Sequence, residues 1–471
     1  MLTLADIVQG LADRRPPELE RRPTKVHVDS RKVEPDGIFF ALQGERADGH
    51  DFVAHAVENG AAMVVIERPV AADLVEVDLS GATPELPEVW ELPVALRVPS
   101  TLEALQRLAA FWRRRHSPRV IGITGSVGKT TTKELTADVL AVRYHTLKSA
   151  RSFNNEIGLP LTLLRLTPEH ERVVLEMGMY DVGEIADLAR IALPHVGVVT
   201  IISPVHLERA GTMERIVRAK TELVEALPPD PDGVAILNYD EPLVLGMKES
   251  TRARVFTYGL SPEADLWASD IEGLGLEGVR FELHYQGEAL HVRVPLLGRH
   301  SVHTALRAAA VGLVEGLSWH EIFGGLRAPS SQLRLAAVSG PQGATILDDT
   351  YNASPASTIA ALNLLEELEG RRIAVLGDML ELGDYEREGH EKVGMRAMEV
   401  VDVLITVGPR GRIIGETALR WGCLPDQVHI LETNAEAVAL LEQMVTEGDV
   451  ILVKGSRALE MEEIVNVLGR E

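Results

Sequence analysis

The chain of 471 residues is 45% hydrophobic, which suits about three domains with separate apolar cores. Its formal net charge is −23, from 70 acidic and 47 basic residues, and no run rich in Lys or Arg offsets it, so nucleic acid is not an expected partner. The single cysteine, Cys423, excludes an internal disulfide framework and a cysteine-based metal cluster, and it fits a reducing cytoplasm.

The N-terminus has no basic stretch followed by an apolar core, and no run of ~18 consecutive apolar residues occurs. We therefore expect a cytoplasmic protein that is neither exported nor inserted in a membrane. A monomer is the default expectation.

Residues 1–99 are predicted to form a small α/β domain. Short apolar strands are indicated at 37–42 and 62–66, with a helix at 51–59 between them.

Residues 100–330 are predicted to form a central domain with a mainly parallel sheet. Ser100 is placed to cap a helix at 102–115 that bridges into this domain. Between 266 and 297 the pattern changes to alternating strands with Gly-rich turns, which predicts an antiparallel appendage. The strands expected before it alternate with helical segments and lie at 119–124, 172–176, 196–202 and 233–238.

Residues 331–471 are predicted to form a doubly wound, Rossmann-like domain that begins at the Ala-Pro-Ser-Ser segment at 328–331. No Gly-x-Gly-x-x-Gly follows its first strand, so a dinucleotide is not the expected ligand. Its strands are expected at 344–349, 372–377, 402–407, 427–431 and 449–454. The fold class is therefore α/β with three domains.

A glycine-rich turn joins the first central strand to a helix. Glycines let successive backbone N–H groups converge on phosphate oxygens, the helix N-terminus adds its positive end, and Lys129 adds a cation. The spacing Gly-x-x-Gly-Lys-Thr is shorter than the general phosphate-loop fingerprint, so a simple turn with a solvated lysine is the alternative. We expect a nucleoside triphosphate site at Thr124, Gly125, Ser126, Val127, Gly128, Lys129, Thr130 and Thr131.

Glu176 ends a predicted strand, at the edge of an open α/β sheet where loops line the ligand crevice. With the hydroxyl of Thr130 or Thr131 and the triphosphate, its carboxylate would complete a magnesium site; a surface acid is the alternative. His206 follows the next strand and Lys220 lies on a helix. Alone, each is more typical of a hydrogen-bonded structural histidine and a solvated lysine.

Taken in order, these motifs resemble the Mur ligase family over almost the whole chain. The phosphate loop is followed, as in that family, by 154–160, 176–178, His206 and 219–220. Further stretches resemble the members that add D-alanyl-D-alanine to UDP-N-acetylmuramoyl-tripeptide, and they lie at 29–31, 48–52, 348–355, 376–383 and 453–457.

The resemblance implies that ATP phosphorylates the terminal carboxylate of the UDP-linked tripeptide, after which the amine of D-Ala-D-Ala displaces phosphate. It also implies a role for each domain. Residues 1–99 would bind the UDP end through Ser30 and Arg31, 100–330 would bind ATP, and 331–471 would bind the dipeptide and close on ATP.

The resemblance further assigns roles to single residues. Lys129, His206 and Lys220 would be catalytic, and Lys220 would be carbamylated, so that with His206 it holds a second magnesium ion beside the one at Thr130 and Glu176. A neutral, partly buried lysine can react with carbon dioxide, which turns a cation into an anionic oxygen ligand. ATP would also contact Asn155, Arg334 and Asp349, and the dipeptide would contact Asn352, Lys454 and Ser456.

The chain departs from the family pattern in three places. The usual Gly-x-His-Asn-x-x-Asn reads Gly-Arg-His-Ser-Val-His-Thr at 298–304, so Ser301 and Thr304 replace two amides expected near the nucleotide. Before Arg334 the usual Lys-Gly pair reads Gln-Leu, and the segment at 150–153 lacks the common Gly-Asn pair.

Three other functions are compatible with parts of the pattern. A member that adds a diamino acid to the UDP-linked dipeptide would carry Asp-Asn-Pro-Arg, which is absent, and folylpolyglutamate synthase fits the third domain less well. A nucleotide-regulated binding protein would not need Glu176, His206 and Lys220 together. The sequence does not determine which diamino acid occupies the third position of the tripeptide.

Overall fold

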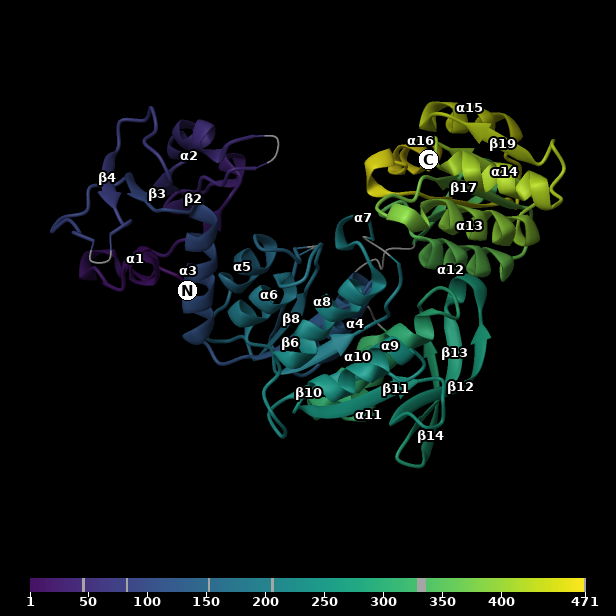
Figure 1. Ribbon diagram of the computed structural model, residues 1–471, viewed down its shortest axis with the longest axis horizontal. Helices are drawn as coiled ribbons and strands as arrows, with labels where there is room; N and C mark the ends of the chain where they lie inside the picture. The colour runs from purple at the N-terminus through teal and green to yellow at the C-terminus, as the bar shows by residue number, and fades with distance from the viewer. Residues whose placement is uncertain (45–46, 82–83, 151–152, 205–206, 328–335, 470–471) are drawn as a thin grey trace.

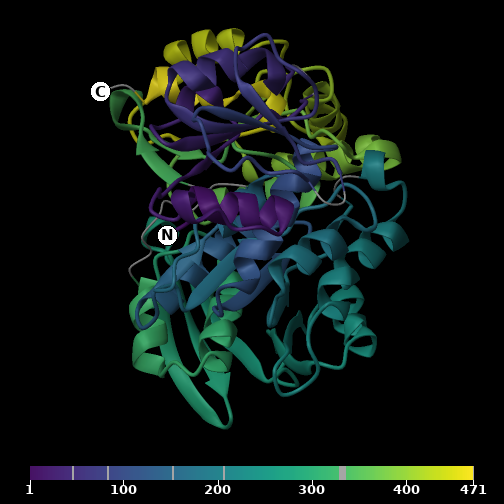
Figure 2. The same ribbon diagram turned by 90° about the vertical axis from the view of Figure 1, so that its left-hand side faces the viewer.

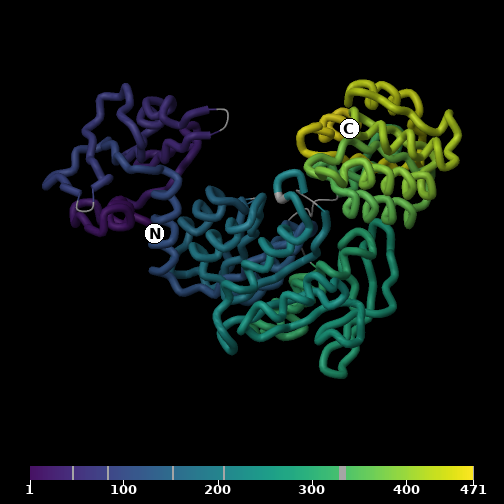
Figure 3. The backbone as a smooth tube through the Cα atoms, viewed as in Figure 1, coloured from purple at the N-terminus to yellow at the C-terminus, as the bar shows by residue number. Residues whose placement is uncertain are grey.

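The computed structural model describes residues 1–44, 47–81, 84–150, 153–204, 207–327 and 336–469. Within these residues three sheets follow one another along the chain, each covered by helices (Figure 1). The N-terminal and C-terminal parts lie at opposite ends of the central part and stand apart from each other (Figure 3). No described helix is long and apolar enough to span a membrane.

The N-terminal part is a parallel sheet of five strands in the order β1-β2-β3-β5-β4. The strands predicted at 37–42 and 62–66 are present as β2 and β3. The helix predicted at 51–59 is wrong in detail, because a 3-10 turn at Gly49–Phe52, capped by Asp48, precedes a shorter α-helix. The elements are α1 (Leu4–Ala12), β1 (Val26–His27), β2 (Gly37–Phe40), α2 (Val53–Glu58), β3 (Ala61–Ile66), β4 (Val75–Asp78) and β5 (Val94–Arg97).

Helix α3 (Thr101–Arg114) connects the N-terminal and central parts. Its N-cap is Ser100, as predicted, since the Ser100 hydroxyl accepts a hydrogen bond from the backbone N–H of Glu103. Helix α1 packs across α3 at Gly10, where a Cβ would lie 2.6 Å from Leu108 Cδ1. In Figure 2, α1 lies between the N-terminal sheet and the central part, and one apolar core runs through all three.

The central part is built on a sheet of nine strands in the order β14-β13-β12-β11-β10-β9-β6-β8-β7. The antiparallel strands predicted between 266 and 297 are present, and they extend this sheet because β12 pairs in parallel with β11. The strands are β6 (Arg119–Thr124), β7 (Thr146–Lys148), β8 (Arg172–Glu176), β9 (Val196–Val199), β10 (Val234–Asn238), β11 (Arg254–Gly259), β12 (Leu266–Gly273), β13 (Val279–Tyr285) and β14 (Glu288–Val294).

Strand β9 ends three residues earlier than predicted. Its continuation turns toward the phosphate loop, where the backbone N–H of Ser126 donates to the carbonyl of Ile201 over 2.7 Å. The helices of this part are α4 (Lys129–Ala141), α5 (Gly158–Leu163), α6 (Glu184–Ala192), α7 (Leu207–Ala210), α8 (Met213–Glu225), α9 (Pro242–Leu245), α10 (Ser301–Val314) and α11 (Trp319–Arg327).

The C-terminal part has a sheet of six strands in the order β15-β16-β20-β17-β18-β19. All pairs are parallel except β15 with β16, and β15 is an edge strand that the sequence did not predict. The elements are β15 (Ala336–Ser339), β16 (Thr345–Asp348), α12 (Pro355–Glu366), β17 (Arg372–Gly377), α13 (Glu386–Val400), β18 (Val403–Val407), α14 (Gly411–Trp421), β19 (Val428–Leu431), α15 (Asn434–Met444), β20 (Val450–Lys454) and α16 (Glu462–Leu468).

Candidate active site

A cavity of about 670 Å³ lies between the central and C-terminal parts. The residues lining it include the phosphate loop at 126–131 and the side chains of Glu176 and Lys220 from the central part. From the C-terminal part, Asp349 and Lys454 line the same cavity. Groups that are far apart in sequence are therefore brought together at the carboxyl ends of two parallel sheets, which is the usual ligand position in such folds.

The phosphate loop takes the conformation that its glycines permit. Gly125 and Gly128 have φ of 143° and 83°, in the left-handed region that other residues avoid. Gly128 precedes α4, so the positive end of that helix faces the cavity. The Lys129 ammonium donates to the carbonyls of Gly125 and Ser126 over 2.8 and 3.2 Å. These contacts fix the conformation of the loop.

Glu176 is almost fully buried, with 1% of its surface exposed. Its carboxylate accepts hydrogen bonds from the Thr130 hydroxyl at 2.7 Å and from the Asn154 amide at 2.8 Å. The described residues contain no cluster of at least three His, Cys, Asp or Glu side chains suited to a metal. A magnesium ion here would therefore need phosphate oxygens and water beside Thr130 and Glu176, which is the coordination magnesium prefers.

Lys220 lines the same cavity from α8 and is 2% exposed. Burial lowers the pKa of its amine well below the ordinary value, and the nearby charge of Lys129 lowers it further. These conditions favour the neutral, nucleophilic form that carbamylation requires.

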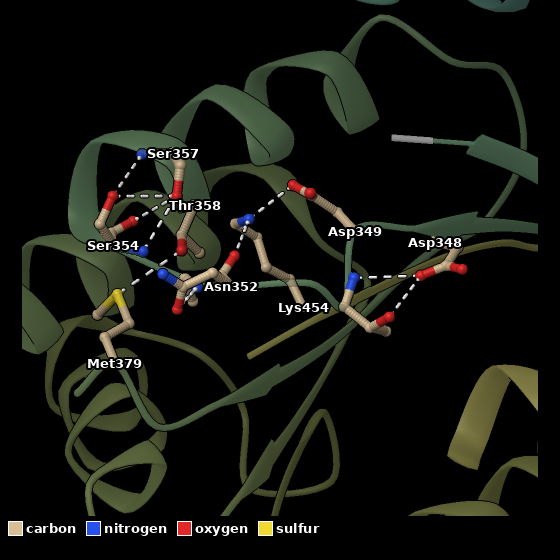
Figure 4. A network of polar contacts seen from close by, with 10 residues as sticks. Asp348, Asp349, Asn352, Ser354, Ser357, Thr358, Met379 and Lys454 are labelled. Atoms are coloured by element: carbon tan, nitrogen blue, oxygen red, sulfur yellow. Dashed lines mark hydrogen bonds and ion pairs between the residues drawn. The ribbon is translucent and has the colours of Figure 1, made fainter. Parts of the chain in front are cut away.

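On the C-terminal side, Lys454 forms the centre of a polar network (Figure 4). Its ammonium pairs with the Asp349 carboxylate at 2.6 Å and donates to the Asn352 carbonyl at 2.8 Å, and Lys454 is only 2% exposed. Ser354 then caps α12, because its hydroxyl accepts from the backbone N–H of Ser357. The ion pair between Lys454 and Asp349 fixes the loop between β16 and α12 against β20.

Comparison with known proteins identifies the chain. Mur ligase sequence models match at 23–113 (Mur ligase family, catalytic domain), 123–312 (Mur ligase middle domain) and 333–457 (Mur ligase, glutamate ligase domain). The UDP-N-acetylmuramoyl-tripeptide--D-alanyl-D-alanine ligase of Bacillus subtilis is 37% identical over 99% of this chain and 97% of its own length. The chain belongs to the Mur ligase family.

Solved Mur ligase structures agree with this assignment. MurF from Acinetobacter baumannii is 31% identical, with a TM-score of 0.84 over 99% of this chain and 98% of its own. MurF from Thermotoga maritima, solved in complex with ADP, is 27% identical with a TM-score of 0.76 and covers 94% of this chain and 96% of its own. The predicted family and the three-part α/β fold are confirmed.

Two candidate residues named from the sequence, His206 and Arg334, lie outside the described residues. Asn155 lines the cavity, and its side chain also accepts from the backbone N–H of Gly158. Ser456 does not line the cavity, and its hydroxyl instead accepts from the backbone N–H of Leu380.

Thr124 and the N-terminal pair also have defined surroundings. Thr124 is fully buried at the end of β6, behind the loop rather than in the cavity. In the N-terminal part, the Ser30 hydroxyl lies 3.0 Å from His55 Nδ1, and Arg31 is exposed and pairs with Asp29.

The first turns of α10 add cavity residues, and one of them, Arg307, was not selected from the sequence. The Ser301 hydroxyl, which replaces one expected amide, donates to the Leu297 carbonyl at 2.6 Å. The Thr304 hydroxyl, which replaces the other, accepts from Arg307 at 2.8 Å, and both line the cavity. Nothing in the sequence singled out Arg307, because an isolated charged residue on a helix normally indicates a solvated position.

Proposed function

We propose that this chain is an ATP-dependent ligase that joins D-alanyl-D-alanine to UDP-N-acetylmuramoyl-tripeptide in the synthesis of peptidoglycan precursors. The observation that carries this proposal is full-length similarity to enzymes of that name, combined with a single cavity that holds the phosphate loop, Glu176, Lys220, Asp349 and Lys454. ATP use is further supported by the ADP complex of the Thermotoga maritima relative.

The reaction proceeds in two transfers. A carboxylate oxygen of the tripeptide attacks the γ-phosphorus of ATP, the bond from that phosphorus to the bridging oxygen breaks, and ADP leaves. The amine of D-Ala-D-Ala then attacks the acyl carbon of the acyl phosphate, phosphate leaves with the former carboxylate oxygen, and the amine loses a proton. Both steps need charge neutralisation and alignment more than covalent help from the protein.

The phosphate loop supplies the neutralisation. Lys129 leaves the carbonyls of Gly125 and Ser126 and donates to the phosphates, beside the N–H groups that open α4. Thr130 and Glu176 would hold magnesium, which when bound would neutralise charge on the phosphate oxygens. This assignment is supported by the buried Glu176 carboxylate and its contact with Thr130.

In a carbamylated form, Lys220 would hold a second magnesium ion together with His206. Its burial and lowered pKa support this role, because only the neutral amine reacts with carbon dioxide. An unmodified ammonium at this position would repel magnesium.

The remaining substrate contacts follow from the three parts of the chain. Ser30 and Arg31 in 1–99 bind the UDP end of the precursor. Within 100–330, Thr131 completes the phosphate loop, Thr124 supports it from behind, and Asn155 contacts ATP.

Residues 331–471 close on ATP and exclude water from the acyl phosphate. Arg334 and Asp349 then contact the phosphates and the ribose, and Asn352 and Lys454 hold the dipeptide, whereas Ser456 supports the loop at Leu380 from outside the cavity. The enzyme acts as a cytoplasmic monomer.

Release of phosphate from ATP, with magnesium, UDP-linked tripeptide and D-Ala-D-Ala, tests the function. We expect release to require both substrates, and single amino acids or folate substrates not to replace them. Oxygen-18 in the tripeptide carboxylate should appear in the released phosphate. Lys129→Ala, as a control for the loop, should bind and turn over little ATP while remaining folded. Phosphate release when one of the two substrates is omitted, or no transfer of oxygen-18 to the phosphate, would contradict the proposal.

A further inference from the structure

We propose that Arg307 binds the phosphates of the nucleotide and so compensates for the amide that Thr304 replaces. This inference rests on the proposed use of ATP at the same cavity. It names a residue that the Mur ligase motifs do not contain.

Arg307 is buried, although it lies at the wall of the cavity. Its exposure is 5% and it is one of the residues that line the cavity. One terminal nitrogen, Nη2, donates to the Thr304 hydroxyl at 2.8 Å, and the other, Nη1, donates weakly to the Tyr258 hydroxyl at 3.4 Å. The buried Nε has no hydrogen-bond partner among the described residues. The guanidinium therefore retains donor capacity at the cavity wall.

Arg307 receives no counter-charge from its hydrogen-bond partners. No ion pair joins it to a carboxylate in the part of the chain that the structure describes. Both of its hydrogen-bond acceptors are neutral, because burial raises the pKa of the Tyr258 phenol and keeps that group protonated. A buried cation without a counter-charge is unfavourable, so its presence in a cavity indicates an anionic ligand.

The position of the guanidinium fits a phosphate ligand. A Cβ placed on Gly128 would lie 3.3 Å from Arg307 Nη2, so the guanidinium packs directly against the phosphate loop. Gly128 is the residue that opens α4, whose first N–H groups and dipole attract anions. Arg307 thus adds a fixed positive charge, on α10, to the field that Lys129 and α4 produce.

The sequence around Arg307 explains why a cation is useful there. An asparagine at 304 would offer a nucleotide two N–H donors and a carbonyl acceptor, whereas the Thr304 hydroxyl has one O–H donor and accepts from Arg307 with one lone pair. Thr304 therefore orients the guanidinium, and Arg307 replaces the lost donor with a charged one. Hydrogen bonds from a charged donor are the stronger kind.

The test compares nucleotides that differ in their phosphates. Arg307→Gln is expected to bind ATP and ADP about 10- to 100-fold more weakly, the range for a hydrogen bond to a charged group. The loss should be smaller for AMP and absent for adenosine, and Arg307→Lys should retain most of the affinity. The affinities are measured by isothermal titration, with adenosine measured by competition.

Arg299→Gln is the matched control, because Arg299 precedes the same helix but is exposed and faces Glu367 at 3.6 Å. It should bind every nucleotide as the wild type does. Wild-type affinity of Arg307→Gln for ATP, or an equal loss for adenosine and ATP, would overturn the inference.

A second variant covers the case in which Arg307→Gln does not fold. Thr304→Val removes the acceptor that orients the guanidinium at nearly constant volume, and it should lose ATP affinity but not adenosine affinity. Unchanged ATP affinity in a folded Thr304→Val would also count against the inference. If the wild-type protein bound no ATP, the proposed function itself would fail. That result differs from unchanged ATP affinity in either variant, which requires a wild type that binds ATP.

Discussion

Replacing Gly125 by alanine is expected to weaken nucleotide binding with little effect on the rest of the fold. Gly125 has φ of 143°, a conformation that costs an L-residue about 1–2 kcal/mol. A Cβ there would overlap the Thr200 hydroxyl and lie 3.0 Å from Thr200 Cβ. That hydroxyl donates to the Val127 carbonyl at 2.7 Å, so moving it away loses a hydrogen bond worth about 1 kcal/mol.

The two costs together are about 2–3 kcal/mol, and both act on the loop conformation that binds phosphate. A cost of this size makes a displaced loop conformation the dominant one, so only a small fraction of the variant can bind phosphate. The apparent affinity for ADP falls in proportion to that fraction, about 30- to 150-fold. Isothermal titration with ADP measures this loss, and thermal denaturation checks that the variant is folded.

Two control variants separate the contributions. Thr200→Ala removes only the hydrogen bond and should weaken ADP binding about fivefold. Gly287→Ala introduces comparable strain, at φ of 83°, in the turn between β13 and β14, where a Cβ meets nothing within 4 Å. It should leave ADP affinity unchanged. If Gly125→Ala bound ADP as tightly as the wild type, the loop would not have the conformation described above.

Three further predictions concern other parts of the molecule. Lys220→Ala should lower ligation about 10²- to 10³-fold, and added bicarbonate should not restore it; turnover like the wild type would remove the carbamate from the mechanism. Lys454→Met leaves the Asp349 carboxylate without its cation and should lower the free energy of unfolding of the C-terminal part, measured with denaturant, by about 3 kcal/mol. Adding Asp349→Asn should restore most of that loss. A single variant as stable as the wild type would contradict this prediction. Hydrogen bonds from the Ser318 hydroxyl and backbone lower the pKa of Glu321 from 4.5 to about 2. This stabilisation is present above pH 4.5 and is lost as the pH falls through 2, so Glu321→Gln should lower the thermal midpoint at neutral pH and the difference should shrink in that window; a constant difference would refute the assignment.

The sequence by itself determined the elements whose cause is local. Strands such as β6, β8 and β17 were predicted at their observed ends, because a continuous apolar run bounded by turn residues is a property of the run itself. The phosphate loop was predicted for the same reason, since glycines at 125 and 128 and the helix that follows are adjacent in the chain. Ser100 was a reliable helix start because its capping bond spans three residues.

The tertiary structure decided what depends on contacts between distant segments. Lys454 and Asp349 are 105 residues apart, and only the pairing of β16 with β20 places them together. Arg307 was not singled out by the sequence, and only the packing of α10 beside the phosphate loop shows that it is buried and, among the described residues, in no ion pair. Propensity and periodicity act over a few residues, whereas burial and charge balance arise from the neighbours that folding brings together.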